Sequence, residues 1–299
     1  MNIQELQTLA DFIRWGASRF NEANLFFGHG TDNAIDEATI LVTHALHLPT
    51  QLPDTLWQAR LTAIEKNKIL ALFEKRLNER VPTPYLINEA WFAGLRFQVN
   101  TQVLIPRSPI AELIEHQFAP WVIPEKIDKV LDLCTGSGCI AIATALLAFP
   151  EAEIDATDIS PPALAIAREN IKNYELTERV HAIESDLFTQ LQDKQYDLIV
   201  CNPPYVSLSE LAAIPLEYQH EPRLGLQAGE DGLDIVKRLL REVHHYLTPH
   251  GILIVEVGNS QYPLMEMYPD VPFTWLEFAR GGEGVFLITQ EQLIQYQFD

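Results

Sequence analysis

Two short motifs in this 299-residue chain combine residue types that could carry out chemistry. The first follows residues 196–201, an apolar run that predicts a buried strand, and it reads Asn202-Pro203-Pro204-Tyr205. The two prolines fix their own φ angles, hold the preceding residues extended and cannot continue a ladder. The result is a stiff arm that presents the Asn202 side-chain oxygen and the Pro203 carbonyl as acceptors, with the flat ring of Tyr205 beside them.

A pair of neighbouring acceptors suits the methylation of a planar NH₂ group. The nitrogen of an amide or aryl amine is a poor nucleophile because its lone pair is delocalised, as the amide rotation barrier of about 18–20 kcal/mol shows. The acceptors would hold the two N–H bonds and stabilise the positive charge that develops during attack. Charge-assisted hydrogen bonds contribute about 1.5–3 kcal/mol each, whereas orientation of two reactants contributes about 7–11 kcal/mol. Positioning is therefore the larger effect, and no strong base is required.

The second motif is a glycine loop between a predicted strand, residues 130–133, and a helix. Gly136 and Gly138 allow a tight turn and a close approach of the backbone to a ligand. The helix that opens after Gly138 offers unpaired N–H groups and a positive dipole end. Because open α/β sheets bind ligands at the carboxyl ends of their strands, we expect this loop to lie in the same row as Asn202.

Acidic residues near the loop indicate which ligand it binds. The Gly-x-Gly-x-x-Ala pattern also satisfies the dinucleotide fingerprint, with Asp158 at about the spacing of the ribose-binding acid. A carboxylate at Asp132 would repel a pyrophosphate and favour a cationic ligand such as S-adenosylmethionine. Asp158 could then accept from two ribose hydroxyls, and Asp186 would meet the adenine end. The alternative is a plain tight turn with solvated aspartates at the strand ends. For the loop the ligand-binding interpretation is favoured, whereas for Asp186 the two interpretations are evenly balanced.

The elements around these motifs fall into three parts. Apolar residues spaced by three and four, such as Leu6, Leu9 and Ile13, predict a helical bundle over residues 1–80, and Asp54 is expected to cap its third helix. Residues 81–107, which begin with helix-ending prolines, predict a linking β-hairpin. Residues 108–299 alternate strands with helices, which is typical of a mostly parallel sheet covered on both faces.

The α/β part of the chain is expected to hold seven strands. The last two are joined by a connection too short for a crossover helix, so they must pair antiparallel. The predicted strands cover residues 130–133, 153–157, 180–184, 196–201, 251–257, 274–278 and 284–289.

Composition limits the class of protein and its partners. Hydrophobic residues make up 47% of the chain, enough for a core, and 41 acidic against 21 basic residues give a net charge of −20. So acidic a surface repels phosphates, which argues against stable binding to duplex nucleic acid, and attracts a basic partner. With three cysteines and no long apolar run, the chain is expected to be cytoplasmic, without a disulfide framework, a metal site or a membrane span.

Taken together, the two motifs resemble those of the S-adenosylmethionine-dependent amino-methyltransferases, in the order and spacing of the enzymes that act on protein glutamine. The resemblance covers nearly the whole chain and implies a Rossmann-like class I methyltransferase domain, with the helical bundle recognising the substrate. It implies that Asn202, Pro203, Pro204 and Tyr205 bind the glutamine amide, with Asn202, Pro203 and Tyr205 catalytic. The implied cofactor-binding residues are Asp132, Cys134, Thr135, Gly136, Ser137, Gly138, Asp158, Asp186 and Asn202.

Two bacterial branches of this family modify release factors or the third protein of the large ribosomal subunit. Cys134 stands where release-factor enzymes usually have glycine. Together with residues 105–110 and 88–94, this cysteine makes the chain resemble the ribosomal branch. That resemblance implies a large-subunit ribosomal protein as substrate. Alternatives are glutamine methylation of release factors, methylation of a nucleic-acid base, an NAD-dependent oxidoreductase and a non-catalytic adaptor. The absence of a basic stripe in the sequence weighs against methylation of a nucleic-acid base. The proline arm, which an oxidoreductase or an adaptor would leave unexplained, weighs against those two alternatives.

Four further features have more ordinary interpretations. The segment His220-Glu221-Pro222-Arg223 could be a lid with His220 as a proton acceptor, but a surface loop is favoured. Arg107 either orients a substrate or pairs with a carboxylate such as Glu112. The adjacent histidines at 244 and 245 are expected on a helix surface, and the three cysteines are expected to be small buried residues.

Overall fold

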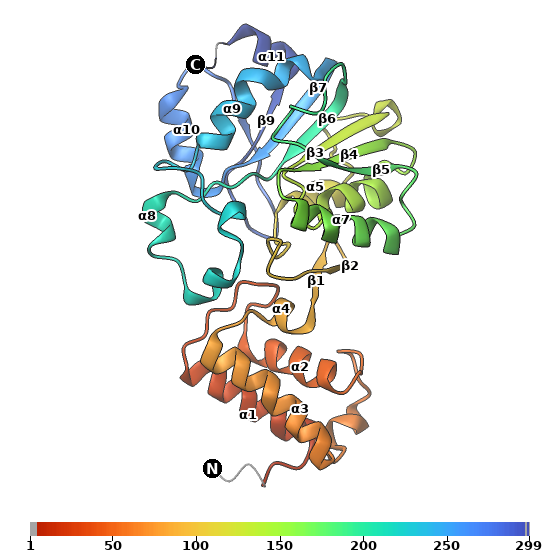
Figure 1. Ribbon diagram of the computed structural model, residues 1–299, viewed down its shortest axis with the longest axis vertical. Coiled ribbons are helices and arrows are strands. Elements are labelled where there is room, and N and C mark those ends of the chain that lie inside the picture. Colours follow the sequence, from red (N-terminus) through yellow and green to blue (C-terminus); the bar gives the residue numbers. More distant parts are fainter. Residues whose placement is uncertain (1–4, 297, 299) are drawn as a thin grey trace. The chain divides into compact units, whose positions relative to one another are not determined.

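A computed structural model describes residues 5–296 and 298, and the chain divides into two compact units (Figure 1). The first unit runs to Glu89 and includes Pro215–His220, a segment that follows the Asn-Pro-Pro-Tyr motif in sequence. The second unit holds Ala90–Ile214 and the chain from Glu221 onward. The residues expected to form a linker, 81–107, are thus divided between the two units.

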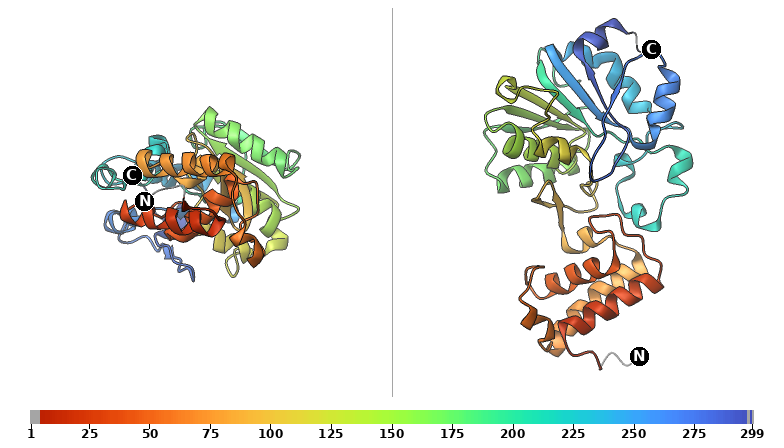
Figure 2. Two further views of the ribbon diagram at one scale, coloured as in Figure 1. Left: turned by 90° about the horizontal axis from the view of Figure 1, so that it is seen from below. Right: turned by 180° about the vertical axis from the view of Figure 1, so that it is seen from behind.

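The first unit is the expected bundle of helices, and they pack side by side around a shared apolar core (Figure 2). Threonines begin two of them, since Thr8 caps the first and Thr62 the third through their side-chain oxygens. The prediction that Asp54 caps the third helix is wrong, because Asp54 starts a separate 3₁₀ turn. The elements are α1 (Leu9–Glu22), α2 (Ala34–Ala45), the 3₁₀ turn Asp54–Gln58, α3 (Ala63–Glu74), a π-turn (Lys75–Glu79) and α4 (Thr83–Ile87).

A buried arginine fastens Pro215–His220 into the helical unit. The Arg76 side chain is 1% exposed, and its guanidinium lies 3.1 Å from Glu37 Oε2 and 3.1 Å from Glu217 Oε1. Its Nη2 also donates to the carbonyl of Phe26 at 2.8 Å. Burial raises the pKa of Glu37, while the charge of Arg76 opposes that rise. A charged cluster therefore joins residues that lie far apart in sequence.

The second unit is built on a seven-stranded sheet of order β5-β4-β3-β6-β7-β9-β8. Only β9 runs against the others: it pairs antiparallel with both β7 and β8, which confirms the predicted pairing of the last two strands. Two expected bounds were wrong, since the fifth strand begins at Leu247 and the sixth holds only two residues. The strands are β3 (Lys129–Leu133), β4 (Glu153–Asp158), β5 (Val180–Glu184), β6 (Tyr196–Cys201), β7 (Leu247–Glu256), β8 (Thr274–Trp275) and β9 (Val285–Thr289).

Helices cover both faces of this sheet, as Figure 1 shows. Successive strand residues face opposite sides, so Val130 joins one apolar cluster and Leu131 the other. The first cluster contains α5 (Ile110–Glu115), α6 (Cys139–Ala143) and α7 (Pro161–Asn173), and the second contains α9 (Asp234–Glu242), α10 (Gln261–Met267) and α11 (Gln290–Gln295). The two helical layers thus pack on a sheet whose parallel strands end in one row. In the described part of the chain, no helix is long and apolar enough to cross a bilayer.

The predicted hairpin is also present, as the two-stranded sheet of β1 (Glu89–Phe92) and β2 (Leu95–Gln98). Asn170 on α7 ties it to the glycine loop. Its side chain accepts from the amide of Gln98 at 2.8 Å and donates to the carbonyls of Gln98 and Ser137, at 3.1 and 2.8 Å. The hairpin therefore contributes to the support of the loop, although sequence reasoning assigned no role to Asn170.

Candidate active site

The glycine loop has the backbone that its sequence predicts. It leaves β3 after Leu133 and turns through positive φ at Cys134, Gly136 and Gly138 before α6 begins. A Cβ at Gly138 would lie 3.3 Å from Ala167 of α7, so the loop packs close to that helix. A Cβ at Gly136 would meet no atom within 4 Å, and Gly136 lines a cavity of this unit at the carboxyl ends of the strands. The loop therefore leaves open space for a ligand beside its backbone.

Asp132 lies beneath the loop and supports it. Its Oδ2 accepts from the Thr135 hydroxyl at 2.5 Å and from the Ala141 amide at 3.0 Å, which connects β3, the loop and α6. Burial raises the pKa of Asp132 to about 7, although those two hydrogen bonds oppose the rise. Asp132 is not among the residues that line the cavity, so its contact is with the loop rather than with the ligand space.

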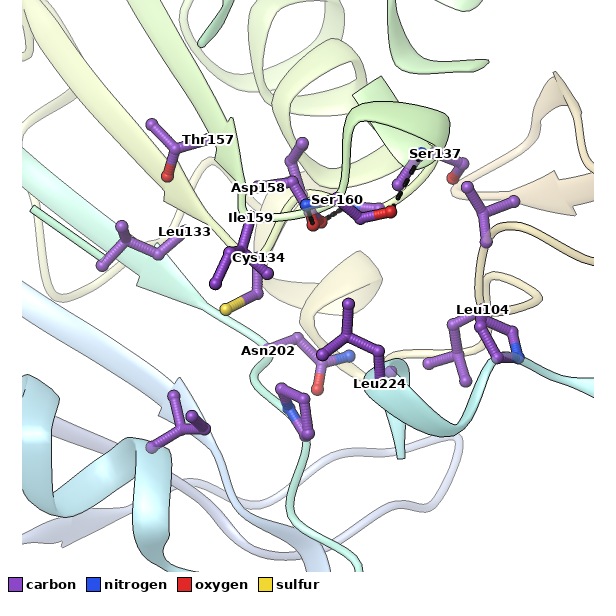
Figure 3. Close-up of a pocket in the computed structure, with 18 of the residues that line it drawn as sticks. Leu104, Leu133, Cys134, Ser137, Thr157, Asp158, Ile159, Ser160, Asn202 and Leu224 are labelled. Carbon is purple, nitrogen blue, oxygen red and sulfur yellow. Dashed lines mark hydrogen bonds between the residues drawn. The ribbon is translucent and has the colours of Figure 1, made fainter. Parts of the chain in front are cut away.

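Asp158 and Asp186 both line the cavity at the ends of neighbouring strands. The Asp158 carboxylate accepts from the amide of Gly136 at 2.9 Å. It also accepts from the amide of Ser160 at 2.9 Å, and Figure 3 shows these two residues side by side. Burial raises its pKa. Asp186 is paired with Arg238, whose Nη2 lies 2.9 Å from both carboxylate oxygens. Asp158 thus organises the loop as well as facing the ligand space, and Arg238 is a further residue of the wall that sequence reasoning missed.

The Asn-Pro-Pro-Tyr arm lies directly after β6, whose neighbours in the sheet are β3 and β7. Asn202 and Pro204 line the cavity, and Figure 3 shows Asn202 on the same side of it as Cys134. The Asn202 Oδ1 atom is buried and accepts a hydrogen bond from none of the described residues. Leaving such an oxygen unsatisfied costs about 1–3 kcal/mol, a cost that an incoming N–H donor would remove. Pro203 and Tyr205 lie beside the cavity wall without lining it.

The expected cofactor fits the residues that surround this cavity. Seven of the nine expected cofactor-binding residues line it: Cys134, Thr135, Gly136, Ser137, Asp158, Asp186 and Asn202. The Ser137 Oγ is buried and has no hydrogen-bond partner among the described residues. S-adenosylmethionine carries hydroxyl, ammonium and carboxylate groups, for which these carboxylates, orphaned oxygens and loop amides are suitable partners.

An ion pair at the rim brings distant segments together. Arg107 binds Glu221 through two hydrogen bonds of 2.6 and 2.8 Å, rather than pairing with Glu112. Glu112 instead accepts from Arg280. Glu221 is buried, so it is not part of a plain surface loop, whereas His220 contacts the Glu79 carbonyl in the helical unit and does not line the cavity.

The cysteines and histidines provide no obvious second centre. Cys139 and Cys201 are buried, and burial raises the pKa of the Cys139 thiol to about 12. Cys134 is half-buried, and both Cys134 and Cys139 line the cavity. The adjacent His244 and His245 follow α9. Among the described residues, no three or more histidine, cysteine, aspartate or glutamate side chains are arranged to hold a metal ion.

This sheet order, with one reversed strand, a glycine loop after β3 and an Asn-Pro-Pro-Tyr arm after β6, defines a class I methyltransferase. Residues 117–214 match the family model of the methyltransferase small domain. The chain is 52% identical over 292 residues to the ribosomal protein uL3 glutamine methyltransferase of Xanthomonas campestris pv. campestris. It is 49% identical over 296 residues to the protein of that name from Francisella tularensis subsp. tularensis.

These alignments cover 98% and 99% of the chain and 94% of each relative. The chain therefore belongs to the family of ribosomal protein glutamine methyltransferases. Among solved structures, the hMettl16 catalytic domain in complex with a MAT2A 3′UTR hairpin covers 83% of this chain and 87% of its own, with 18% identity and a TM-score of 0.50. At that identity the likeness bears on the fold alone.

Proposed function

We propose that this protein transfers a methyl group from S-adenosylmethionine to the side-chain amide nitrogen of a glutamine in ribosomal protein uL3. The observation that carries the proposal is the buried, unpartnered oxygen of Asn202 at the wall of the cavity that also contains the glycine loop. The names of the relatives support glutamine as the acceptor and uL3 as the protein that carries it.

The chain's own residues position the two reactants. S-adenosylmethionine, when bound, supplies a methyl group on a positively charged sulfur. Asp158 and the loop amides would hold it, together with Ser137, Cys134 and Asp186. Asn202 Oδ1 accepts from one N–H of the glutamine amide and aims its nitrogen. We assign the second N–H to the backbone carbonyl of Pro203, which lies between the two residues of the arm that line the cavity, Asn202 and Pro204. As positive charge develops on the nitrogen, these oxygens stabilise it, and the proton leaves after transfer.

The remaining parts of the proposal concern recognition and location. The helical unit would recognise the substrate protein, with residues 108–299 providing the methyltransferase machinery. A net charge of −20 favours a basic protein partner over a nucleic-acid duplex. A ribosomal protein as substrate supports a cytoplasmic location for the enzyme.

Label transfer tests this function directly. The protein and methyl-labelled S-adenosylmethionine are incubated in separate reactions with unmethylated uL3, with release factors and with DNA. The label in each reaction is then mapped by mass spectrometry. We expect label on a uL3 glutamine. Label only on a release factor or only on a base would overturn the substrate assignment.

A substitution tests the role of the arm. Asn202→Ala should leave the affinity for S-adenosylhomocysteine nearly unchanged while turnover falls by about 10²-fold or more, because orientation of the amide is lost. Calorimetry and initial rates measure the two quantities. Glu242→Ala, on the exposed surface of α9, is the control. Near-normal turnover in Asn202→Ala would contradict the proposed contact.

A further inference from the structure

Glu256 is a buried carboxylate beside the arm that the reaction described above does not use. It is the last residue of β7 and 5% exposed. Val255, the residue before it, pairs with Cys201 of the neighbouring parallel strand. Glu256 therefore lies at the strand end next to the point where the Asn-Pro-Pro-Tyr arm begins.

Both oxygens of Glu256 bind hydroxyl groups. The Tyr205 hydroxyl donates to Oε1 at 2.8 Å, and the Ser108 hydroxyl donates to Oε2 at 2.5 Å. Ser108 lies just before α5 and also accepts from the amide of Ile110 at 3.2 Å. The carboxylate thus joins the end of β7, the start of α5 and the last residue of the arm.

Other contacts hold Tyr205 in the same place. A Cβ at Gly258 would lie 2.7 Å from the Tyr205 ring, so the ring packs directly on the backbone there. Ser260 donates to the Tyr205 carbonyl at 2.9 Å. The segment that follows β7 therefore holds the ring and the carbonyl of Tyr205, while Glu256 holds its hydroxyl.

The arm is consequently fixed at both ends. Cys201 is held by the sheet at one end and Tyr205 by these contacts at the other, and two prolines restrict the backbone between them. Asn202 has few ways to reorient when both ends are fixed, and so its oxygen keeps its direction at the cavity wall. Burying a carboxylate is costly unless hydrogen bonds compensate, and here its two partners are hydroxyls at the site.

We propose that Glu256 is a positioning residue for methyl transfer: by accepting the Tyr205 hydroxyl it holds the arm so that Asn202 points at the acceptor amide. This role rests on the proposed function. Glu256 itself touches no reacting atom, and it acts through Tyr205. It should therefore affect turnover rather than cofactor binding.

A double-mutant cycle tests the proposal. Glu256→Ala should lower kcat by about 10²-fold, the effect of a misplaced reactant, with the Kd for S-adenosylhomocysteine unchanged by calorimetry. Glu256→Gln should retain most activity, because its Oε1 can still accept the Tyr205 hydroxyl. In a Tyr205→Phe background, Glu256→Ala should add little further loss, since the same bond is already absent. Additive losses, or a Gln variant as poor as the Ala variant, would overturn the role.

A second readout needs no substrate and so separates this inference from the proposed function. Hydrogen exchange in the peptide covering residues 202–211 should accelerate in Glu256→Ala and in Tyr205→Phe, but not in Glu256→Gln or in Glu242→Ala. If Glu256→Ala does not fold, Tyr205→Phe carries the test, because it removes the same bond from the other side. Unchanged exchange in Tyr205→Phe would refute the anchor, whereas absence of uL3 methylation by the unsubstituted protein would refute only the proposed function.

Discussion

Asn202 and Asp132 each have a buried side-chain oxygen, and the two residues differ in what that oxygen contacts. The Asn202 oxygen at the cavity wall has no partner among the described residues, so it is ready for an incoming N–H. Asp132 accepts two hydrogen bonds from the loop region, yet burial still raises its pKa to about 7. Asp132 thus holds the loop through Oδ2 at the expense of its own ionisation, while its Oδ1, like the Asn202 oxygen, has no partner among the described residues.

The raised pKa of Asp132 predicts a pH-dependent stability. An unfolded aspartate has a pKa of about 3.9, so between about pH 4 and 7 the folded chain retains a proton that the unfolded chain releases. The retained proton therefore contributes to the free energy of unfolding. This contribution is fully present below about pH 4 and is lost as the pH rises through about 7. Asp132→Asn does not ionise and keeps an acceptor oxygen, so it should gain stability relative to the unsubstituted protein over that range, by at most about 4 kcal/mol.

Urea unfolding at pH 4, 5, 6, 7 and 8 measures this difference. The exposed Asp193→Asn variant is the control. The difference between its free energy of unfolding and that of the unsubstituted protein should not change with pH. A flat difference for Asp132→Asn as well would contradict the ionisation argument.

Cys134 shows a residue preference that the backbone explains. Its φ of 61° lies in the left-handed region, which strains a residue with a side chain and suits glycine. The thiol also lines the cavity, so a change to glycine would relieve backbone strain and remove one wall contact.

Asp158 acts between elements, because it ends β4 and binds the amides of both the glycine loop and the first turn before α7. We expect Asp158→Ala to raise the Kd for S-adenosylhomocysteine by at least about tenfold. Hydrogen bonds to charged groups contribute about 1.5–3 kcal/mol each, and tenfold corresponds to about 1.4 kcal/mol. Isothermal calorimetry measures the change. Asp186→Ala should weaken binding less, since the Asp186 carboxylate is already paired with Arg238. An unchanged Kd for S-adenosylhomocysteine in folded Asp158→Ala would contradict the role assigned to Asp158.

At the scale of the whole molecule, the chain returns to the helical unit after it has formed part of the sheet unit. Pro215–His220 follows β6 and the arm, yet it belongs to the helical unit, where Arg76 binds Glu217. The segments on either side of it, including Glu221, belong to the unit that holds the active site. The two units are therefore joined by three passages of the chain rather than by one linker.

Arg76 should be a major determinant of the helical unit's stability. Arg76→Met would leave Glu37 and Glu217 buried without their main cation, which typically costs about 3–5 kcal/mol. Urea unfolding followed by circular dichroism measures the loss, and hydrogen exchange should accelerate in residues 215–220. The matched control is Arg80→Met, whose guanidinium is partly exposed and lies farther from Glu217, at 3.4 Å; its loss should be smaller. A loss below about 1 kcal/mol in Arg76→Met would contradict the importance of the cluster.

Local patterns predicted most of the fold. The strand and glycine-loop signals, the Asn-Pro-Pro-Tyr arm and the short last connection depend on neighbouring residues, and the seven strands, the hairpin and the antiparallel pair were confirmed. Partners distant in sequence were not predicted. Arg107 binds Glu221, 114 positions away, rather than nearby Glu112. Glu256 carries no motif beyond being a lone carboxylate at the end of an apolar strand.

The amino-acid sequence by itself determined the two chemical motifs, the α/β alternation and the family, because each follows from residues close together along the chain. The tertiary structure alone decided that Asp132 supports the loop instead of lining the cavity, that Tyr205 is bound by Glu256, and that 215–220 lies in the helical unit. These outcomes depend on which buried side chains meet across the fold. Hydrogen bonds between such side chains are chosen by packing and desolvation, and neither can be evaluated from sequence spacing.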